Sequence, residues 1–153
     1  MIIAVDFDGT IVEHQYPDIG RQIPFAINVL KKLQQEERHQ LILWTVREGE
    51  LLERALDYCE QQGLKFYAVN CNYPEEIFEE GMSRKINADL YIDDKNCGGI
   101  PDWGVMYRMI KSGINDIRCL DDFMFEDDNI PVKKKNFLIR LGETWDLIRG
   151  RKY

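Results

Sequence analysis

Short apolar runs rich in β-branched residues alternate along this chain with stretches of helical periodicity. The first run, Ile2-Ile3-Ala4-Val5, is continuous and ends in carboxylates, which is typical of a strand buried on both faces of a parallel sheet. Residues 41–45, 65–69 and 90–92 predict three more strands. Because strands alternate with helices, the sequence predicts an α/β fold, a three-layer Rossmann-like arrangement with a mainly parallel central sheet.

The helical stretches lie between or after these strands. An apolar stripe over residues 24–38 predicts the first helix, and apolar residues at helical spacing over 48–62 predict the second. Gly63 follows at the position where a left-handed cap is favoured. Residues 102–111 predict a third helix. Farther along, the pattern predicts an edge strand over 113–119, an acidic loop over 121–131 and an amphipathic helix over 137–148.

Length, charge and cysteine content narrow the class of protein. The length of 153 residues predicts one domain, with residues 113–153 as a C-terminal extension that packs on the core. A net charge of −7 disfavours binding to nucleic acids or to anionic membranes. The four cysteines show no C-x-x-C pair and no zinc spacing, and the N-terminus does not resemble a signal peptide. We therefore expect a cytoplasmic protein with reduced thiols and no membrane partner.

Acidic and hydroxyl side chains follow three of the predicted strands. Asp6 and Asp8 come directly after the first strand, Thr45 ends the second, and Asp93-Asp94 follows the fourth. In parallel α/β sheets, ligands bind at the carboxyl ends of the strands. The sequence therefore predicts that these side chains converge on one edge of the sheet.

Carboxylates that lie close together repel one another and need a counter-charge. All-oxygen ligands suit Mg²⁺, which binds one or two carboxylates together with water and phosphate oxygens. Lys85 would add a fixed positive charge, so the pattern favours phosphoryl transfer to Asp6 as a nucleophile. Asp8 is close enough in sequence to protonate a leaving oxygen and later to activate water. Gly9 lets the backbone approach a phosphate, and Thr45 can donate a hydrogen bond to a phosphoryl oxygen.

These residues form a recognisable pattern. A buried strand is followed by D-x-D-G-T at positions 6–10, a strand ends in Thr45, and Lys85 then precedes the pair Asp93-Asp94. Over residues 1–100 this order resembles the haloacid dehalogenase (HAD) superfamily of phosphohydrolases. The second aspartate of the motif makes the chain similar to the phosphatase and phosphomutase branches.

The resemblance assigns roles to particular residues. It implies a Mg²⁺-dependent phosphomonoester hydrolase in which Asp6 forms an aspartyl-phosphate and Asp8 is the general acid and base. The residues with implied catalytic roles are Asp6, Asp8, Thr45 and Lys85, with Arg84 as the nearest rival of Lys85. The implied metal ligands are Asp6, Asp8 through its backbone carbonyl, Asp93 and, through water, Asp94. The expected contacts to substrate come from Gly9, Thr10 and Arg47.

The segments between these motifs are too short to hold a cap domain, which needs at least about 50 residues. We therefore expect a capless phosphatase with an open site, which resembles family members that act on large substrates or close the site by oligomerising. The expected partner is a phosphorylated small molecule, and a homo-oligomer is a further expectation. Residues 9–23 form a long loop after the first strand and resemble the mobile flap of the family. In this loop His14, Tyr16 and Arg21 are either substrate contacts or parts of a solvated connector.

Three alternatives stay open on the sequence alone. A signalling receiver domain also uses aspartates, threonine, lysine and Mg²⁺, although its acceptor aspartate follows the third strand, where this chain has Val69-Asn70-Cys71. A non-catalytic binding domain is the second alternative. The third keeps the chemistry and changes the substrate to a nucleic-acid end or a phosphoprotein, and the net negative charge disfavours the nucleic acid.

Overall fold

The structure is a computed structural model that describes residues 1–113 of the chain. The chain divides into two units, Met1–Leu120 and Asp121–Tyr153, and every element described here belongs to the first. The edge strand, acidic loop and last helix predicted beyond residue 113 lie outside the described residues. The predictions of a single domain and of a C-terminal extension packed on its core therefore remain predictions.

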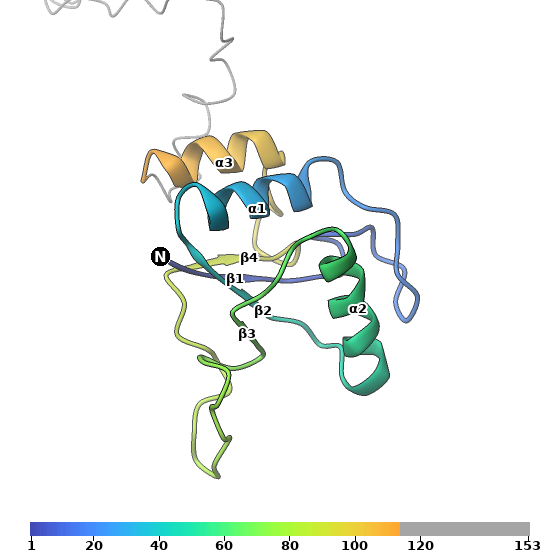
Figure 1. Cartoon of the computed structure of the whole chain (residues 1–153), viewed down its shortest axis with the longest axis vertical. Helices are drawn as coiled ribbons and strands as arrows, with labels where there is room; N and C mark the ends of the chain where they lie inside the picture. Colours follow the sequence, from blue (N-terminus) through green and yellow to red (C-terminus); the bar gives the residue numbers. More distant parts are fainter. Residues whose placement is uncertain (114–153) are drawn as a thin grey trace, which may run out of the picture. The chain divides into compact units, whose positions relative to one another are not determined.

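A four-stranded parallel sheet lies at the centre of the first unit (Figure 1). Its strands are β1 (Ile2–Val5), β2 (Gln40–Leu43), β3 (Ala68–Val69) and β4 (Leu90–Ile92), in the spatial order β3-β2-β1-β4. Val5 is level with Leu43 on one side and with Ile92 on the other, and Leu43 is level with Val69. The four strands thus end together at one edge, and the predicted α/β, Rossmann-like fold is confirmed.

Three helices accompany the sheet, close to where the periodicity predicts them. They are α1 (Ala26–Gln35), α2 (Gly49–Gln61) and α3 (Trp103–Lys111). The first begins two residues after Pro24, because Phe25 adopts a left-handed φ of 66°. Gly63 has the predicted left-handed conformation after α2, with φ 76°. No helix in residues 1–113 combines the length and the hydropathy needed to cross a membrane.

Side chains alternate between the two faces of the sheet. Ile3 and Val5 join a large hydrophobic cluster that contains buried residues from α1, α2 and α3, and Figure 1 shows α1 and α3 side by side. Ala4 and Ile42 point to the other face, where they pack with Ile86. Within the described residues the helices therefore cover one face, and residues 70–89, which form neither helix nor strand, contribute the packing on the other.

Candidate functional site

Three carboxylates meet at the carboxyl edge of the sheet. One oxygen atom from each of Asp6, Asp93 and Asp94 lies within 4.8 Å of the others. The cause is the register of two adjacent strands: Val5 is level with Ile92, and the Asp6 backbone N–H donates to the Ile92 carbonyl at 2.9 Å. The aspartates that follow β1 and β4 are therefore neighbours. Asp6, Asp93 and Asp94 together are called the acidic cluster below.

Gly9 and Thr10 hold the acidic cluster together. Gly9 has a φ of 91°, and a Cβ at this position would lie 2.5 Å from Asp94 Oδ2. Thr10 is fully buried; its hydroxyl donates to Asp6 Oδ2 at 3.2 Å and accepts from the Asp94 backbone N–H at 3.1 Å. Thr10 thus positions both carboxylates, and the absence of a side chain at Gly9 lets Asp94 approach. The expected contacts of Gly9 and Thr10 with substrate stay a prediction.

Burial and crowding change the acidity of Asp6. Burial is the main reason why the pKa of Asp6 is raised from 3.8 to about 6, and the negative charges of Asp93 and Asp94 add to the rise. Hydrogen bonds from the Phe7 backbone and the Thr10 hydroxyl oppose it. When no metal ion is bound, Asp6 therefore holds its proton to a higher pH than an exposed aspartate does.

Asp94 presents one satisfied oxygen and one unsatisfied oxygen. The Lys95 ammonium donates to Asp94 Oδ2 at 2.8 Å, and this hydrogen bond, with the attraction of Asp94 and the weaker attraction of Asp6 and Asp93, raises the pKa of Lys95. Asp94 Oδ1 is buried and has no hydrogen-bond partner among the described residues. A buried carboxylate oxygen without a partner is costly, so the cluster has an unmet demand for a cation or a donor.

The cation at the acidic cluster is thus Lys95, which the motif pattern did not single out. Lys85, the predicted cation, is exposed, and its ammonium lies over the Tyr91 ring at 5.1 Å. Within residues 1–113, no hydrogen bond or ion pair joins Lys85 to the acidic cluster. The available signal for Lys95 was its place directly after Asp94.

Thr45 lies at the same edge of the sheet, just beyond β2. Its backbone N–H donates to Asn70 Oδ1 at 2.8 Å, and its hydroxyl accepts from the Arg47 backbone N–H at 3.2 Å. The hydroxyl hydrogen of Thr45 can therefore be donated to a ligand. This position agrees with the predicted role as a phosphoryl contact, and that role stays a prediction.

Asp8 is held in a buried ion pair with Arg47. Arg47 Nε and Nη2 each donate to one carboxylate oxygen of Asp8 at 2.7 Å, and the Arg47 and Asp8 side chains are 0% and 5% exposed. Arg47 also donates to the backbone carbonyls of Pro17 and Asp18 and packs over the Phe7 ring. The sequence predicted that Arg47 contacts substrate. The structure instead engages its donors inside the protein, where Arg47 positions Asp8.

The same arginine fixes the loop that follows β1. Besides the two carbonyl contacts, the Tyr16 ring lies over the Arg47 guanidinium at 5.4 Å. Arg21 forms an ion pair with Glu13 at 2.8 Å, and His14 is exposed. Arg21 therefore has its contact within the loop itself, and Tyr16 packs on the arginine that holds Asp8.

The donor set of the acidic cluster suits a hard divalent cation. Its ligands are all oxygens, as Mg²⁺ prefers. The Oδ1 of Asp94 is buried without a partner even though Lys95 contacts the other oxygen, so the cluster can accept further positive charge. The Asp8 side chain, which is bound to Arg47, does not belong to the cluster. The three carboxylates could therefore hold Mg²⁺ without help from the Asp8 carboxylate.

Comparison with known proteins identifies a relative among the solved structures. No protein-family profile and no curated protein sequence matches the chain. A solved structure of a conserved protein from Bacteroides thetaiotaomicron is similar, with 64% sequence identity and a TM-score of 0.69. The match covers 74% of this chain and 91% of the Bacteroides chain. The chain belongs to the same family as that conserved bacterial protein.

Proposed function

We propose that the chain is a Mg²⁺-dependent phosphomonoester hydrolase in which Asp6 accepts the phosphoryl group. The observation that carries this proposal is the acidic cluster with its buried, unpartnered Asp94 oxygen. A carboxylate nucleophile next to a cation site at the carboxyl edge of a parallel sheet supports phosphoryl transfer. The D-x-D-G-T motif, through its resemblance to the HAD phosphohydrolases, points to the same chemistry.

Asp6, Asp93 and Asp94 would hold the metal ion. When bound, Mg²⁺ would neutralise negative charge on the carboxylates and on the phosphoryl oxygens. Lys95 adds positive charge at the same place through its contact with Asp94. Thr45, whose hydroxyl hydrogen is available, donates to a phosphoryl oxygen.

The chain's own residues carry the bond changes. An oxygen of the ionised Asp6 carboxylate forms a bond to phosphorus while the bond between phosphorus and the ester oxygen breaks. The departing alcohol oxygen takes up a proton. Water then attacks phosphorus, the bond between Asp6 and phosphorus breaks, and inorganic phosphate leaves with the Asp6 carboxylate restored. Thr10 keeps the Asp6 side chain in place through its hydroxyl.

Asp8 is proposed as the group that supplies the proton and later accepts one from water. In the arrangement seen here both of its oxygens accept hydrogen bonds from Arg47, so neither oxygen is free to exchange a proton with a substrate or with water. Asp8 must leave this ion pair to act, and the loop carbonyls that Arg47 also holds must then shift. Substrate binding is the event that would supply the competing contacts.

The direct test is phosphate release from an aryl phosphate in the presence of Mg²⁺. Asp6→Asn removes the nucleophile and should lower the rate at least about a thousandfold. Excess EDTA should have a similar effect on the wild-type protein. Asp57→Asn, the same chemical change at an exposed position on α2, is the control and should keep full activity. Activity that survives both Asp6→Asn and EDTA would refute the proposal.

The buried pairing of Asp8 with Arg47 favours a second candidate, a phosphoryl-accepting switch domain that turns over slowly. In that case Asp6 would take the phosphoryl group but little Asp8 would be available to assist hydrolysis. The time course separates the two. A switch releases one equivalent of leaving group and then stops, whereas an enzyme releases it linearly over many turnovers.

A further inference from the structure

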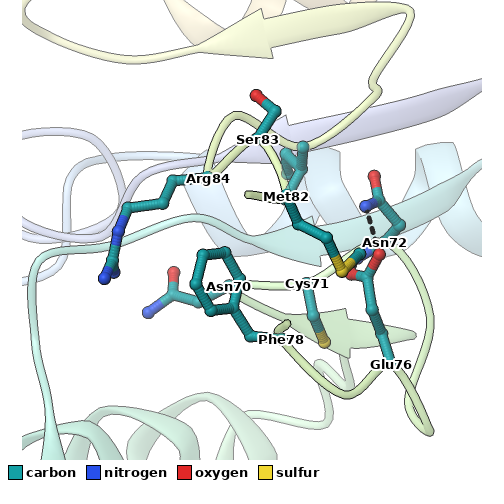
Figure 2. A pocket seen from close by; sticks show the side chains of 9 residues that line it. Asn70, Cys71, Asn72, Glu76, Phe78, Met82, Ser83 and Arg84 are labelled. Atoms are coloured by element: carbon teal, nitrogen blue, oxygen red, sulfur yellow. Dashed lines mark hydrogen bonds between the residues drawn. The ribbon is translucent and has the colours of Figure 1, made fainter. Parts of the chain in front are cut away.

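A small pocket opens beside the carboxyl end of β3, on the face of the sheet that residues 70–89 cover (Figure 2). Its volume is about 40 Å³. A cavity needs about 10–15 Å³ on this measure to hold one water, so the pocket accepts a group of a few heavy atoms. It is therefore the size of a carboxylate or a phosphate group, not of a whole ligand.

One wall of the pocket is positively charged. The Arg84 guanidinium lies over the Phe78 ring at 4.9 Å, which orients the group without using its N–H donors. No ion pair or hydrogen bond occupies this guanidinium within residues 1–113. Figure 2 shows the Asn70 amide on the same side as the Arg84 guanidinium. Asn70 uses its oxygen for the Thr45 backbone, which leaves its amide N–H₂ available.

The carboxylate that lines the pocket is that of Glu76, which lies on the opposite wall and already accepts hydrogen bonds. Both oxygens of Glu76 accept hydrogen bonds from Asn72, one from the backbone and one from the side-chain amide. Figure 2 shows Glu76 and Asn72 together, away from the Arg84 guanidinium. Two donor groups, Arg84 and Asn70, thus share a small space in which an anion would be bound.

The pocket lies within reach of the acidic cluster. Asn70 follows β3 directly and contacts Thr45, which follows β2, and Asp6 follows β1 at the same level of the sheet. Adjacent strands are about 4.8 Å apart, so two strand spacings separate the backbones of Asp6 and Asn70 by about 10 Å. A small phosphomonoester with a second acidic group could span this distance.

We propose that the Arg84–Asn70 wall binds a second anionic group of the substrate, which makes the substrate a small phosphomonoester that also carries a carboxylate or a second phosphate. The inference rests on the proposed function and defines the substrate class of the same site. One charged hydrogen bond from Arg84 and one from the Asn70 amide are enough to hold an anion of this size.

Binding of uncleavable probes tests the proposal without relying on catalysis. The probes are an alkylphosphonate that ends in a carboxylate, one that ends in a second phosphonate, and one of equal length that ends in a methyl group. Calorimetry on the full chain with Mg²⁺ should show at least about tenfold tighter binding of one doubly acidic probe than of the methyl probe. The better of the two acidic probes identifies the second group as carboxylate or phosphate.

Arg84→Met should remove this preference and leave the affinity for the methyl probe within about twofold. Arg38→Met is the matched control, because Arg38 is exposed and lies before β2, at the opposite edge of the sheet. Equal affinity of the wild-type protein for all three probes would overturn the inference, as would an equal loss for every probe in Arg84→Met. If Asp6→Asn keeps its phosphatase activity while the probe preference holds, the proposed function fails and the anion site stands.

Discussion

At the scale of single residues, the buried ion pair between Asp8 and Arg47 is the contact whose disruption is expected to destabilise the fold most. Both side chains are buried, and Arg47 also ties the Pro17 and Asp18 carbonyls to the body of the protein. Removing one partner of a buried pair leaves the other charge without compensation. Arg47 therefore supports the fold as well as the position of Asp8.

Arg47→Met should lower the free energy of unfolding by about 3–5 kcal/mol. Arg54→Met is a suitable control, because Arg54 is half exposed and reaches the same loop through a 3.6 Å contact with Asp18. An exposed pair contributes only about 0–1 kcal/mol, so the control should change little. Urea denaturation measures both variants, and equal losses would contradict the buried-pair account.

The raised pKa of Asp6 predicts a pH dependence of stability in the metal-free protein. Asp6 titrates near 3.8 in the unfolded chain and near 6 in the folded one, so the folded state binds more protons between these values. Its contribution is fully present below the unfolded pKa and is lost as the pH rises through the folded pKa. Stability in EDTA should therefore fall between about pH 4 and pH 7.

Asp6→Asn should remove this fall, which amounts to about 2 kcal/mol after allowance for solvent screening. Thermal denaturation of both proteins across the pH range gives the comparison, with Asp57→Asn as the control. Parallel pH profiles for the wild-type protein and Asp6→Asn would show that burial and the acidic neighbours do not raise the pKa of Asp6.

The sequence located some of these residues and missed others for physical reasons. Asp6, Asp93 and Asp94 follow strands, and the parallel sheet brings strand ends together whatever the loops do. The ammonium of Lys95 reaches Asp94 because of the turn after β4, in which the Asn96 backbone N–H donates to the Asp93 carbonyl. Turn conformations of this kind are not readable from residue types alone, so the sequence pattern favoured Lys85.

At the scale of elements, α3 links the helical layer to the candidate site. Asp102 caps the helix, and its side chain accepts from the backbone N–H groups of Gly104 and Val105. Trp103 is buried, and its indole N–H donates to the Thr10 carbonyl at 3.3 Å. The start of α3 thus supports the turn that positions the acidic cluster.

Asp102→Ala should cost about 1 kcal/mol of stability, because it removes the cap of α3. Asp57→Ala, at an exposed position within α2, should change stability by less than about 0.5 kcal/mol. Chemical denaturation distinguishes the two variants, and a loss of similar size in both would contradict the assigned cap.

The existence of each described helix and strand was predictable, and their ends were less so. Periodicity identifies a buried face, but it does not determine where hydrogen bonding stops. β3 contains only Ala68 and Val69, which pair with β2 alone at the edge of the sheet. Pro24 lies outside α1 because Phe25 takes a left-handed conformation. This conformation cannot be predicted from the residue type.

At the scale of the whole described unit, the parallel strands all run in the same direction, so one edge of the sheet carries their carboxyl ends. All four strands end at one edge, which gathers Asp6, Asp93, Thr45 and Asn70 from segments far apart in the sequence. The pocket next to β3 lies on the same unit as the acidic cluster. The match with the Bacteroides protein covers 74% of this chain. The acidic cluster and the pocket can therefore be looked for in the Bacteroides structure.

The most direct measurement is the site of phosphorylation after rapid acid quenching. The wild-type protein and Asp8→Asn are mixed with an aryl phosphate and Mg²⁺, quenched, digested and analysed by mass spectrometry. The account predicts a phosphoryl group on Asp6, with more of it in Asp8→Asn because hydrolysis of the adduct is slowed. Steady turnover of the aryl phosphate with no adduct on Asp6 in either protein would contradict it.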